Sequence, residues 1–177
     1  MELFEVIEKR RSVRSYEKYD IPKKDIEKIL KAGSLAPSGR NIQPYEFIVI
    51  DDEKIIKKLG EEVQNCISEA SVVIGIIADP QMSKYWLEDI SAVTENMLLA
   101  IEDLGYASCW IEGTLLPKEK QIKELLKIPE EKRFIIILPI GKAKGEIPKK
   151  SKKDIKEITH HNFYSNKYFI ADSVKNK

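Results

Sequence analysis

The spacing of hydrophobic residues predicts one long helix in the middle of the chain. Between about residues 85 and 104, apolar side chains recur at steps of three and four positions, which is typical of an amphipathic helix. Ala92, Leu99 and Ala100 widen the apolar face, so we expect this helix to be covered on more than one side, by its own domain or by a partner subunit. The residues expected to face inward are Leu87, Ile90, Val93, Met97, Leu98, Ile101 and Leu104.

Other apolar patterns predict strands and shorter helices. Two uninterrupted apolar runs, residues 72–78 and 134–138, are typical of strands that are buried on both faces, and the second is expected to end at Pro139 and Gly141. In the first predicted helix, the inward positions are Leu3, Val6 and Ile7. The remaining predicted elements are strands over 47–50 and 107–111 and helices over 2–9, 22–33, 54–66 and 118–126.

These elements predict an α+β or three-layer fold. Helices and strands alternate unevenly, and the chain contains no internal repeat, low-complexity tract or Gly/Ser linker. A length of 177 residues suits one compact domain. We therefore expect a single domain over residues 1–177, in which residues 158–177 form a polar and aromatic tail.

Composition argues against several classes of protein. The chain is 42% hydrophobic and 33% charged, as globular proteins are, and its net charge of +1 argues against a dedicated nucleic-acid binder. No apolar run reaches the roughly 20 residues of a membrane-spanning helix, and Glu2 and Glu5 stand where a secretory signal peptide carries basic residues. Cys66 and Cys109 form no CxxC motif. We therefore expect reduced thiols in a cytoplasmic protein, with neither a disulfide framework nor a metal site.

Positive charge is concentrated in two segments despite the near-neutral total. Residues 9–14 hold four basic residues and no acid, and residues 142–156 hold seven lysines against two acids. The rest of the chain is acidic, so the two segments are candidates for facing one anionic ligand. The alternative is that both are ordinary solvated surfaces.

Four short segments offer the groups that a phosphorylated heteroaromatic ligand needs. Residues 10–14 offer three guanidinium groups and a hydroxyl for charge-assisted bonds to phosphate. Residues 37–44 offer a hydroxyl, an unhindered glycine and two amides, which both donate and accept hydrogen bonds. Residues 109–113 follow a buried strand and end in a glycine, which lets backbone N–H groups approach a ligand closely. Residues 148–153 offer lysines that would close over a phosphate from the other side.

Each of the last three segments also has a purely structural interpretation. Residues 37–44 are equally consistent with a proline-bounded turn in which Asn and Gln side chains bond their own backbone. Residues 109–113 would be an ordinary turn after a strand, and residues 148–153 a solvated basic loop. The two histidines, His160 and His161, join no nucleophile or metal-ligand pattern, so we expect them at the surface or at an interface.

The order of these segments resembles that of the nitroreductase family of FMN-dependent oxidoreductases, from Ile7 to about Ile158. The opening segment Arg10-Arg11-Ser12-x-Arg14 resembles the family's first motif. The stretch Ala36-Pro37-Ser38-x-x-Asn41-x-Gln43-Pro44 is similar to the second and is the most specific match. Three further matches are Asp89, 96–99 and 104–105 in the central helix, 109–113 in the flavin-facing turn, and 148–152 in the phosphate motif, with lysine where arginine is common.

The resemblance implies a three-layer α/β/α fold with a central, mostly antiparallel sheet, assembled as a homodimer with two FMN sites at the subunit interface. The opening segment and the late lysines would hold the phosphate and ribityl end, and Arg14 would lie near the flavin pyrimidine. The second segment would come from the other subunit and pack on the ring, while the 111–113 turn would direct a backbone N–H toward flavin N5. The implied cofactor-binding residues are Arg10, Arg11, Ser12, Arg14, Pro37, Ser38, Gly39, Asn41, Ile111, Glu112, Gly113, Lys150 and Lys152.

The activity implied by the resemblance is that of an FMN-dependent NAD(P)H oxidoreductase. NADH or NADPH would load the flavin, and a nitroaromatic, a quinone or a related acceptor would unload it in alternating half-reactions through flavin N5. No side chain is expected to act as acid, base or nucleophile, because the flavin performs the redox chemistry and Arg14 stabilises the charge that develops near flavin N1. Two alternatives stay open: a non-enzymatic flavin-binding or carrier protein, and a specialised reductive branch of the same family.

Overall fold

The computed structural model describes residues 1–147 and 151–168 of the chain. Its internal contacts divide the chain into two compact units, residues 1–147 and residues 148–177. The first unit contains the sheet and all but one of the helices described below. The single domain expected over residues 1–177 stays a prediction.

A five-stranded sheet forms the centre of the first unit. Its strand order is β1-β5-β3-β2, and β4 also pairs with β5, so β5 has three neighbours. Every pair of named strands is antiparallel, as expected from the family resemblance. The strands are β1 (Tyr16–Glu17), β2 (Tyr45–Ile50), β3 (Val72–Ala78), β4 (Ala107–Ser108) and β5 (Arg133–Ala143).

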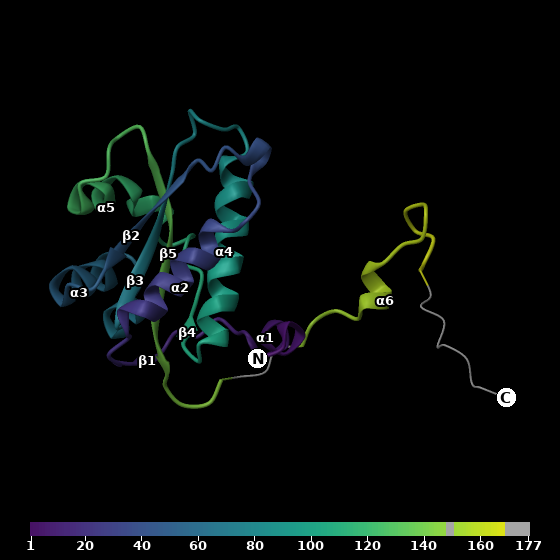
Figure 1. Ribbon diagram of the computed structural model, residues 1–177, viewed down its shortest axis with the longest axis horizontal. Helices are drawn as coiled ribbons and strands as arrows, with labels where there is room; N and C mark the ends of the chain where they lie inside the picture. The colour runs from purple at the N-terminus through teal and green to yellow at the C-terminus, as the bar shows by residue number, and fades with distance from the viewer. Residues whose placement is uncertain (148–150, 169–177) are drawn as a thin grey trace. The chain divides into compact units, whose positions relative to one another are not determined.

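Helices cover both faces of this sheet, which gives the expected three layers. Figure 1 shows α2 and α4 side by side on one face and α3 and α5 on the other. The α-helices of the two units are α1 (Leu3–Lys9), α2 (Lys23–Ser34), α3 (Glu53–Glu62), α4 (Trp86–Asp103), α5 (Glu119–Leu126) and α6 (Ile155–Ile158). Short 3₁₀ helices span Gly39–Asn41, Asn65–Glu69 and Leu116–Lys118.

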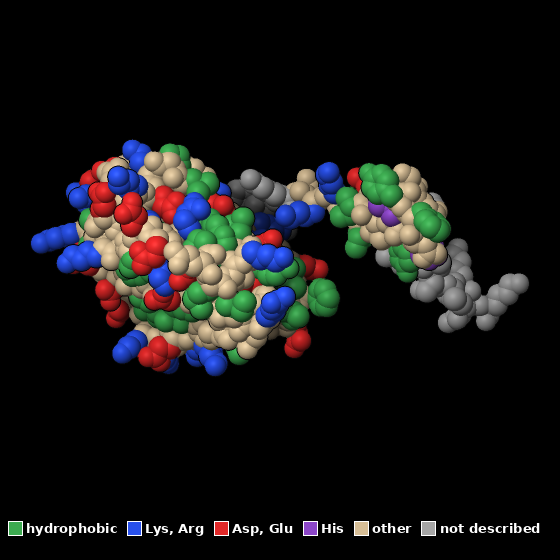
Figure 2. Space-filling view, turned by 90° about the horizontal axis from the view of Figure 1, so that it is seen from above, with side chains coloured by type: hydrophobic (Ala, Val, Ile, Leu, Met, Phe, Trp, Pro, Cys, Tyr) green, Lys and Arg blue, Asp and Glu red, His purple; other side chains and the backbone are tan. Residues whose placement is uncertain are grey.

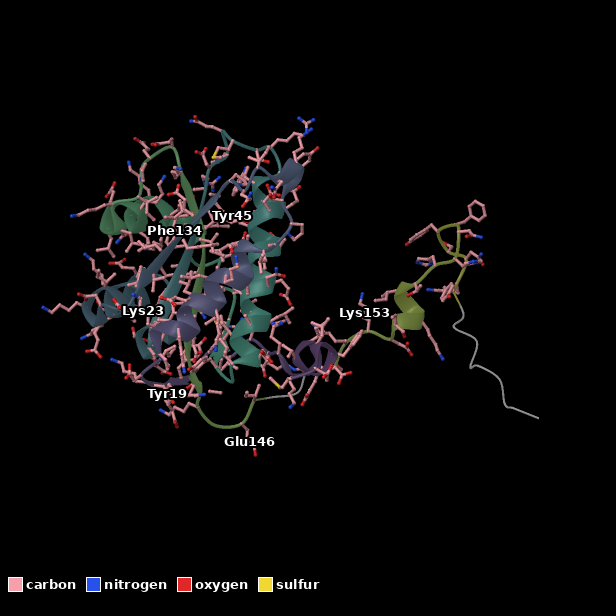
Figure 3. The ribbon with its side chains drawn as sticks, viewed as in Figure 1. Tyr19, Lys23, Tyr45, Phe134, Glu146 and Lys153 are labelled. Carbon is pink, nitrogen blue, oxygen red and sulfur yellow. The ribbon has the colours of Figure 1, made fainter. Side chains whose placement is uncertain are left out.

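The alternation of side chains along β3 divides the hydrophobic core into two clusters. Ile74 and Ile76 pack with the apolar faces of α2 and α4, whereas Val73 packs with α3 and α5. Successive residues of a strand point to opposite faces, so the uninterrupted apolar run of β3 is needed to fill both layers. Figure 3 shows Phe134 on the side of α5 and Tyr45 on the side of α4.

Strand β5 is longer than its apolar pattern predicts. The expectation that it ends at Pro139 was wrong, because the strand continues to Ala143. On one edge of β5, Pro139 pairs with Val73 of β3. On the other edge it has no partner strand residue among the described residues, because Ile137 bridges to Ile111 and the pairing with β4 begins at Ile140. A proline, which lacks an N–H donor, is tolerated in a strand where the ladder on one side is interrupted.

Several predicted inward positions are exposed. In α1 only Val6 is buried, while Leu3 and Ile7 are exposed along with Phe4, which is 77% exposed. At the start of α4, Leu87 is also exposed, although the rest of the helix packs mostly as expected. The apolar face of α1 is therefore available to an external surface. Figure 2 shows basic, acidic and hydrophobic side chains interspersed over the visible face of residues 1–147.

In the second unit, the described residues 151–168 form α6 and a compact turn. The bridge between His160 and Lys167 closes the turn, and the ring of Tyr164 lies 4.7 Å from that of His160. Most of its apolar side chains are exposed, including Phe163 and Tyr164. Within residues 1–147 and 151–168, no helix combines the length and the apolarity that crossing a membrane requires.

The ring of Phe134 occupies the space that a side chain at Gly75, on the neighbouring strand β3, would fill. A Cβ atom at position 75 would lie 2.3 Å from Phe134 Cε2 and 2.9 Å from Ile48 Cγ2. We expect Gly75→Ala to reduce the free energy of unfolding by about 1–3 kcal/mol, because the packed layer has no room for the added methyl group. Urea denaturation followed by circular dichroism measures this change.

The matched control is Gly113→Ala, because a Cβ there meets no atom within 4 Å. With both proteins freed of flavin, we expect this variant to unfold at the same urea concentration as the parent protein. An equal loss of stability in both variants would contradict the packing argument.

Candidate functional site

The sheet brings together two of the four candidate segments. The backbone N–H of Val13 donates to Ser108 O at 2.9 Å, and Ser12 forms a parallel bridge to Ser108. Two positions beyond Cys109, Ile111 exchange hydrogen bonds with Ile137 of β5. Residues 10–14 and 109–113 are therefore adjacent in the first unit, although about 100 positions separate them in the sequence.

The three arginines of residues 10–14 have different surroundings. The Nε atom of Arg10 lies 3.3 Å from Glu95 Oε1 on α4, and its side chain is about one quarter exposed. The guanidinium of Arg11 turns back onto the end of α1, where it donates to Glu8 O and Arg10 O. Arg14 is exposed, with a weak contact of 3.4 Å from its guanidinium to Ser12 O. Arg10 and Arg14 therefore keep donors for a ligand, while Arg11 mainly caps α1.

Helix α4 presents carboxylates to this arginine segment and to the N-terminus. Glu95 pairs with Arg10, as described above, and Asp103 accepts from the amino group of Met1 at 2.7 Å. Partial burial raises the pKa of Glu102, while nearby Arg10 acts in the opposite direction. These acidic partners could not be predicted from the sequence, since Glu95 and Glu102 look like ordinary solvent-facing helix positions.

The turn over residues 110–113 combines one buried side chain with one open backbone position. Ile111 is buried, and Trp110 Nε1 donates to Glu112 Oε2 at 3.0 Å. Glu112 O accepts from the N–H groups of the next helical turn, at Leu115 and Leu116. Gly113 is exposed, and a Cβ built on it meets nothing within 4 Å. The turn is thus fixed in position, yet its backbone at Gly113 is open to an approaching ring.

Left-handed backbone conformations shape the loop over residues 37–43. Arg40, Asn41 and Gln43 all have φ between 54° and 58°, and their side chains are exposed. The Ser38 hydroxyl accepts from Gln43 N–H, and the Gln43 side chain donates to Asn41 O. The structural interpretation of this loop therefore holds for Gln43, whose amide bonds the loop's own backbone.

Asp89 anchors this loop to the start of α4. It is 4% exposed, and its Oδ1 accepts from the backbone N–H of Gly39 at 2.7 Å while Oδ2 accepts from the Ser83 hydroxyl at 3.4 Å. A Cβ at Gly39 would lie 2.7 Å from the Tyr85 ring, so a larger residue there would require this ring to shift. Asp89 appears in the sequence resemblance but was not predicted as a site residue. The signal in the sequence was a carboxylate within a helix that is predicted to be buried on more than one side, because a buried carboxylate needs a polar partner.

Within one chain, the loop and the arginine segment contact different parts of α4. Asp89 and Glu95, which hold the two segments, are about 9 Å apart along the helix axis. Pro37, Ser38 and Gly39 line a shallow hollow of about 360 Å³ together with Tyr85, Glu88, Asp89 and Ala92.

The expected phosphate clamp stays a prediction. Lys152 is exposed within the second unit, and Lys150 lies outside the described residues. The structure therefore tests neither lysine against residues 10–14.

Comparisons with known proteins agree on one family. The model described as the Nitroreductase family matches residues 7–75 and 67–142. A protein of Archaeoglobus fulgidus, provisionally named as an NADH dehydrogenase/NAD(P)H nitroreductase, is 42% identical over 154 residues, which cover 82% of this chain and 87% of that protein.

Solved structures give the same result. An FMN-dependent nitroreductase from Clostridium difficile superposes with a TM-score of 0.81 and 32% identity, covering 90% of this chain and 98% of that one. A Parabacteroides distasonis structure, also provisionally named as an NADH dehydrogenase/NAD(P)H nitroreductase, has a TM-score of 0.85 and 28% identity, covering 93% and 99%.

The anchoring role of Asp89 gives a direct test. In Asp89→Ala, the Gly39 N–H and the Ser83 hydroxyl lose their common acceptor. We expect faster hydrogen exchange at residues 38–41 and a loss of about 1–3 kcal/mol in the free energy of unfolding. Hydrogen–deuterium exchange with mass spectrometry measures the first, and urea denaturation measures the second.

Glu88→Ala is the matched control, because Glu88 is the exposed neighbour on the same helical turn. Exchange in the loop should match that of the parent protein. Unchanged loop exchange in Asp89→Ala would show that other contacts hold the loop.

Proposed function

The chain belongs to the nitroreductase family, and from this membership we propose that it is an FMN-dependent NAD(P)H oxidoreductase. The names of its relatives support both the flavin and the nicotinamide donor. The observation that carries the proposal is the adjacency of residues 10–14 to the turn that ends at Gly113. Cationic donors for a phosphate and an open backbone for a ring then lie on one edge of the sheet.

The groups on this edge fit the chemistry of FMN. A phosphate needs charge-assisted donors, and the guanidinium of Arg10 keeps further N–H groups besides the Nε that contacts Glu95. Ser12 and Arg14 are exposed on the same segment. The open backbone at Gly113 would accept the flat face of an isoalloxazine ring. We assign the phosphate and ribityl end to Arg10 and Ser12, and the ring to Arg14 and Gly113.

Bound FMN would supply hydride transfer from NADH or NADPH to a nitroaromatic, quinone or related acceptor. The protein's part is electrostatic and geometric. Arg14 would place a fixed positive charge beside the pyrimidine edge of the ring, where it lowers the energy of negative charge on the reduced cofactor. The buried side chain of Ile111 and the bond from Trp110 to Glu112 would hold the turn at a constant distance from the ring.

We further propose that the active form is a homodimer. The exposed apolar face of α1, formed by Leu3, Phe4 and Ile7, and the exposed aromatic side chains of residues 163–168 are surfaces that a second copy would cover. In a dimer, the loop over residues 37–43 would complete the site of the neighbouring chain. A cytoplasmic location stays a prediction.

Purification and anaerobic reduction test the proposed function in one sequence of measurements. We expect a yellow protein that releases one FMN per chain on acid precipitation. Its mass by light scattering should be twice that of one chain. NADH or NADPH should then bleach the flavin absorbance, and a nitroaromatic or a quinone should restore it. A colourless protein that ignores added FMN would overturn the proposal, and bound flavin that neither donor reduces would indicate a carrier.

Arg10→Ala tests the assignment of the phosphate end. If Arg10 makes one charge-assisted bond to the phosphate, FMN should bind more weakly by about 1.5–3 kcal/mol, about 10- to 100-fold. Fluorescence titration of the apoprotein with FMN measures the dissociation constant.

Lys58→Ala is the control, since it removes an exposed charge from α3 on the opposite face of the sheet. Equal FMN affinity in the two variants would mean that Arg10 is only surface charge.

A further inference from the structure

The backbone of Arg10 is fixed on both sides of the residue. Its N–H donates to Val6 O at 2.9 Å, at the end of α1. Three positions later, the N–H of Val13 donates to Ser108 O of β4 at 2.9 Å. A helix end and the sheet therefore hold the backbone of Arg10, and the direction of its guanidinium depends on what the side chain itself contacts.

Glu95 supplies that contact from a well-packed turn of α4. Its Oε1 lies 3.3 Å from Arg10 Nε, and the two side chains are 48% and 25% exposed. Both neighbours of Glu95 along the helix are held in place. Thr94 is fully buried, and the side chain of Asn96 donates to Ala32 O of α2 at 3.1 Å. The carboxylate therefore meets Arg10 from a constant position on a rigid element.

The other two arginines of residues 10–14 are held differently. The guanidinium of Arg11 donates to Glu8 O and Arg10 O, and that of Arg14 approaches Ser12 O at 3.4 Å. Both contacts are to backbone carbonyls within the same stretch of chain. Of these three described residues, Arg10 is the one whose guanidinium pairs with a carboxylate from a distant element.

A contact at one edge of a guanidinium determines where its other edges point. The group is planar and rigid, and its five N–H donors have fixed directions. Fixing Nε of Arg10 therefore also fixes the direction of the four N–H groups on its two Nη atoms. A long side chain that is free in solution must instead be ordered when a ligand binds, and this ordering weakens binding.

We propose that Glu95 is a positioning residue for the cofactor phosphate, which acts by holding the Nε edge of Arg10 so that the remaining N–H groups are presented in one direction. The inference rests on the proposed function, because it takes Arg10 as a ligand of the FMN phosphate. Glu95 acts only through Arg10, since a carboxylate and a phosphate repel each other.

That repulsion is an effect of the opposite sign. The negative charge of Glu95 reduces the attraction between Arg10 and an anion, but the carboxylate is about half exposed, so water and salt screen its charge. Screening does not cancel the orientation of the guanidinium. We therefore expect positioning to exceed repulsion. The two effects predict opposite results when the carboxylate is removed, so the sign of the change decides between them.

Fluorescence titration of the apoprotein with FMN and with riboflavin, which lacks the phosphate, tests this role. In Glu95→Ala, FMN should bind about two- to fivefold more weakly, the range expected from a partly exposed ion pair. Riboflavin should bind as it does to the parent protein, because the phosphate is the group that Arg10 contacts. Glu95→Gln keeps a side-chain oxygen of the same reach, so it should retain part of the affinity that Glu95→Ala loses.

Glu102→Gln is the matched control for charge. Glu102 lies on the same face of α4, two turns beyond Glu95, and is close enough to Arg10 for the two charges to interact. Within the part of the chain that the structure describes, it forms no ion pair within 4 Å. This variant removes a negative charge near Arg10 but no contact to its guanidinium, so FMN should bind at least as tightly as to the parent protein.

A double variant tests whether Glu95 acts through Arg10. Once Arg10 has been replaced by alanine, Glu95 has no guanidinium to hold. The double variant Arg10→Ala/Glu95→Ala should therefore bind FMN with the same affinity as Arg10→Ala alone. A residue that only stabilised the fold would weaken FMN binding in either background.

Three results would overturn the inference while leaving the proposed function intact. The first is FMN binding by Glu95→Ala that equals or exceeds that of the parent protein, which would mean that repulsion dominates or that the pair has no effect. The second is an equal loss of FMN and riboflavin affinity. The third is an additive loss in the double variant. A parent protein that binds no FMN would instead overturn the proposed function, and this inference with it.

Discussion

The pairing of β5 with three other strands is the constraint on which the candidate site depends. β5 pairs with β1, β3 and β4, so it fixes the relative positions of segments from the start, the middle and the end of the first unit. The arginine segment lies beside the 109–113 turn only because β4 and Ile111 both attach to this strand. Because helices cover both faces of the sheet, this central strand is apolar on both faces, which explains the run from Phe134 to Leu138.

Most of the fold could be predicted from the sequence, because the regular spacing of apolar residues indicates which side of an element is buried. The bounds of β3 and the extent of α4 follow from their apolar spacing, since such runs are stable only inside a layered core. The far end of β5 could not be predicted, because proline usually terminates a strand and the gap beside Pro139 arises only from tertiary pairing. The exposed face of α1 could not be predicted either, since spacing shows an apolar face but not what covers it.

The site was predictable at the level of segments and less so at the level of contacts. The exposed Arg14 and the open Gly113 were identified from the type of residue at each position. The pairing of Arg10 with Glu95 and the anchoring of the loop by Asp89 were missed, because both join segments that are far apart in the chain.

The left-handed residues of the 37–43 loop determine which amino acids this region tolerates. Arg40 and Gln43 adopt a conformation that glycine and asparagine accept readily and β-branched residues resist. Isoleucine, valine or threonine at either position would force the backbone toward another path, whereas glycine would preserve it. Asn41 has the same backbone conformation, so diversification of its exposed side chain toward a new ligand is limited to residues that accept that conformation, with a flexible or amide-bearing residue kept at Arg40 and Gln43.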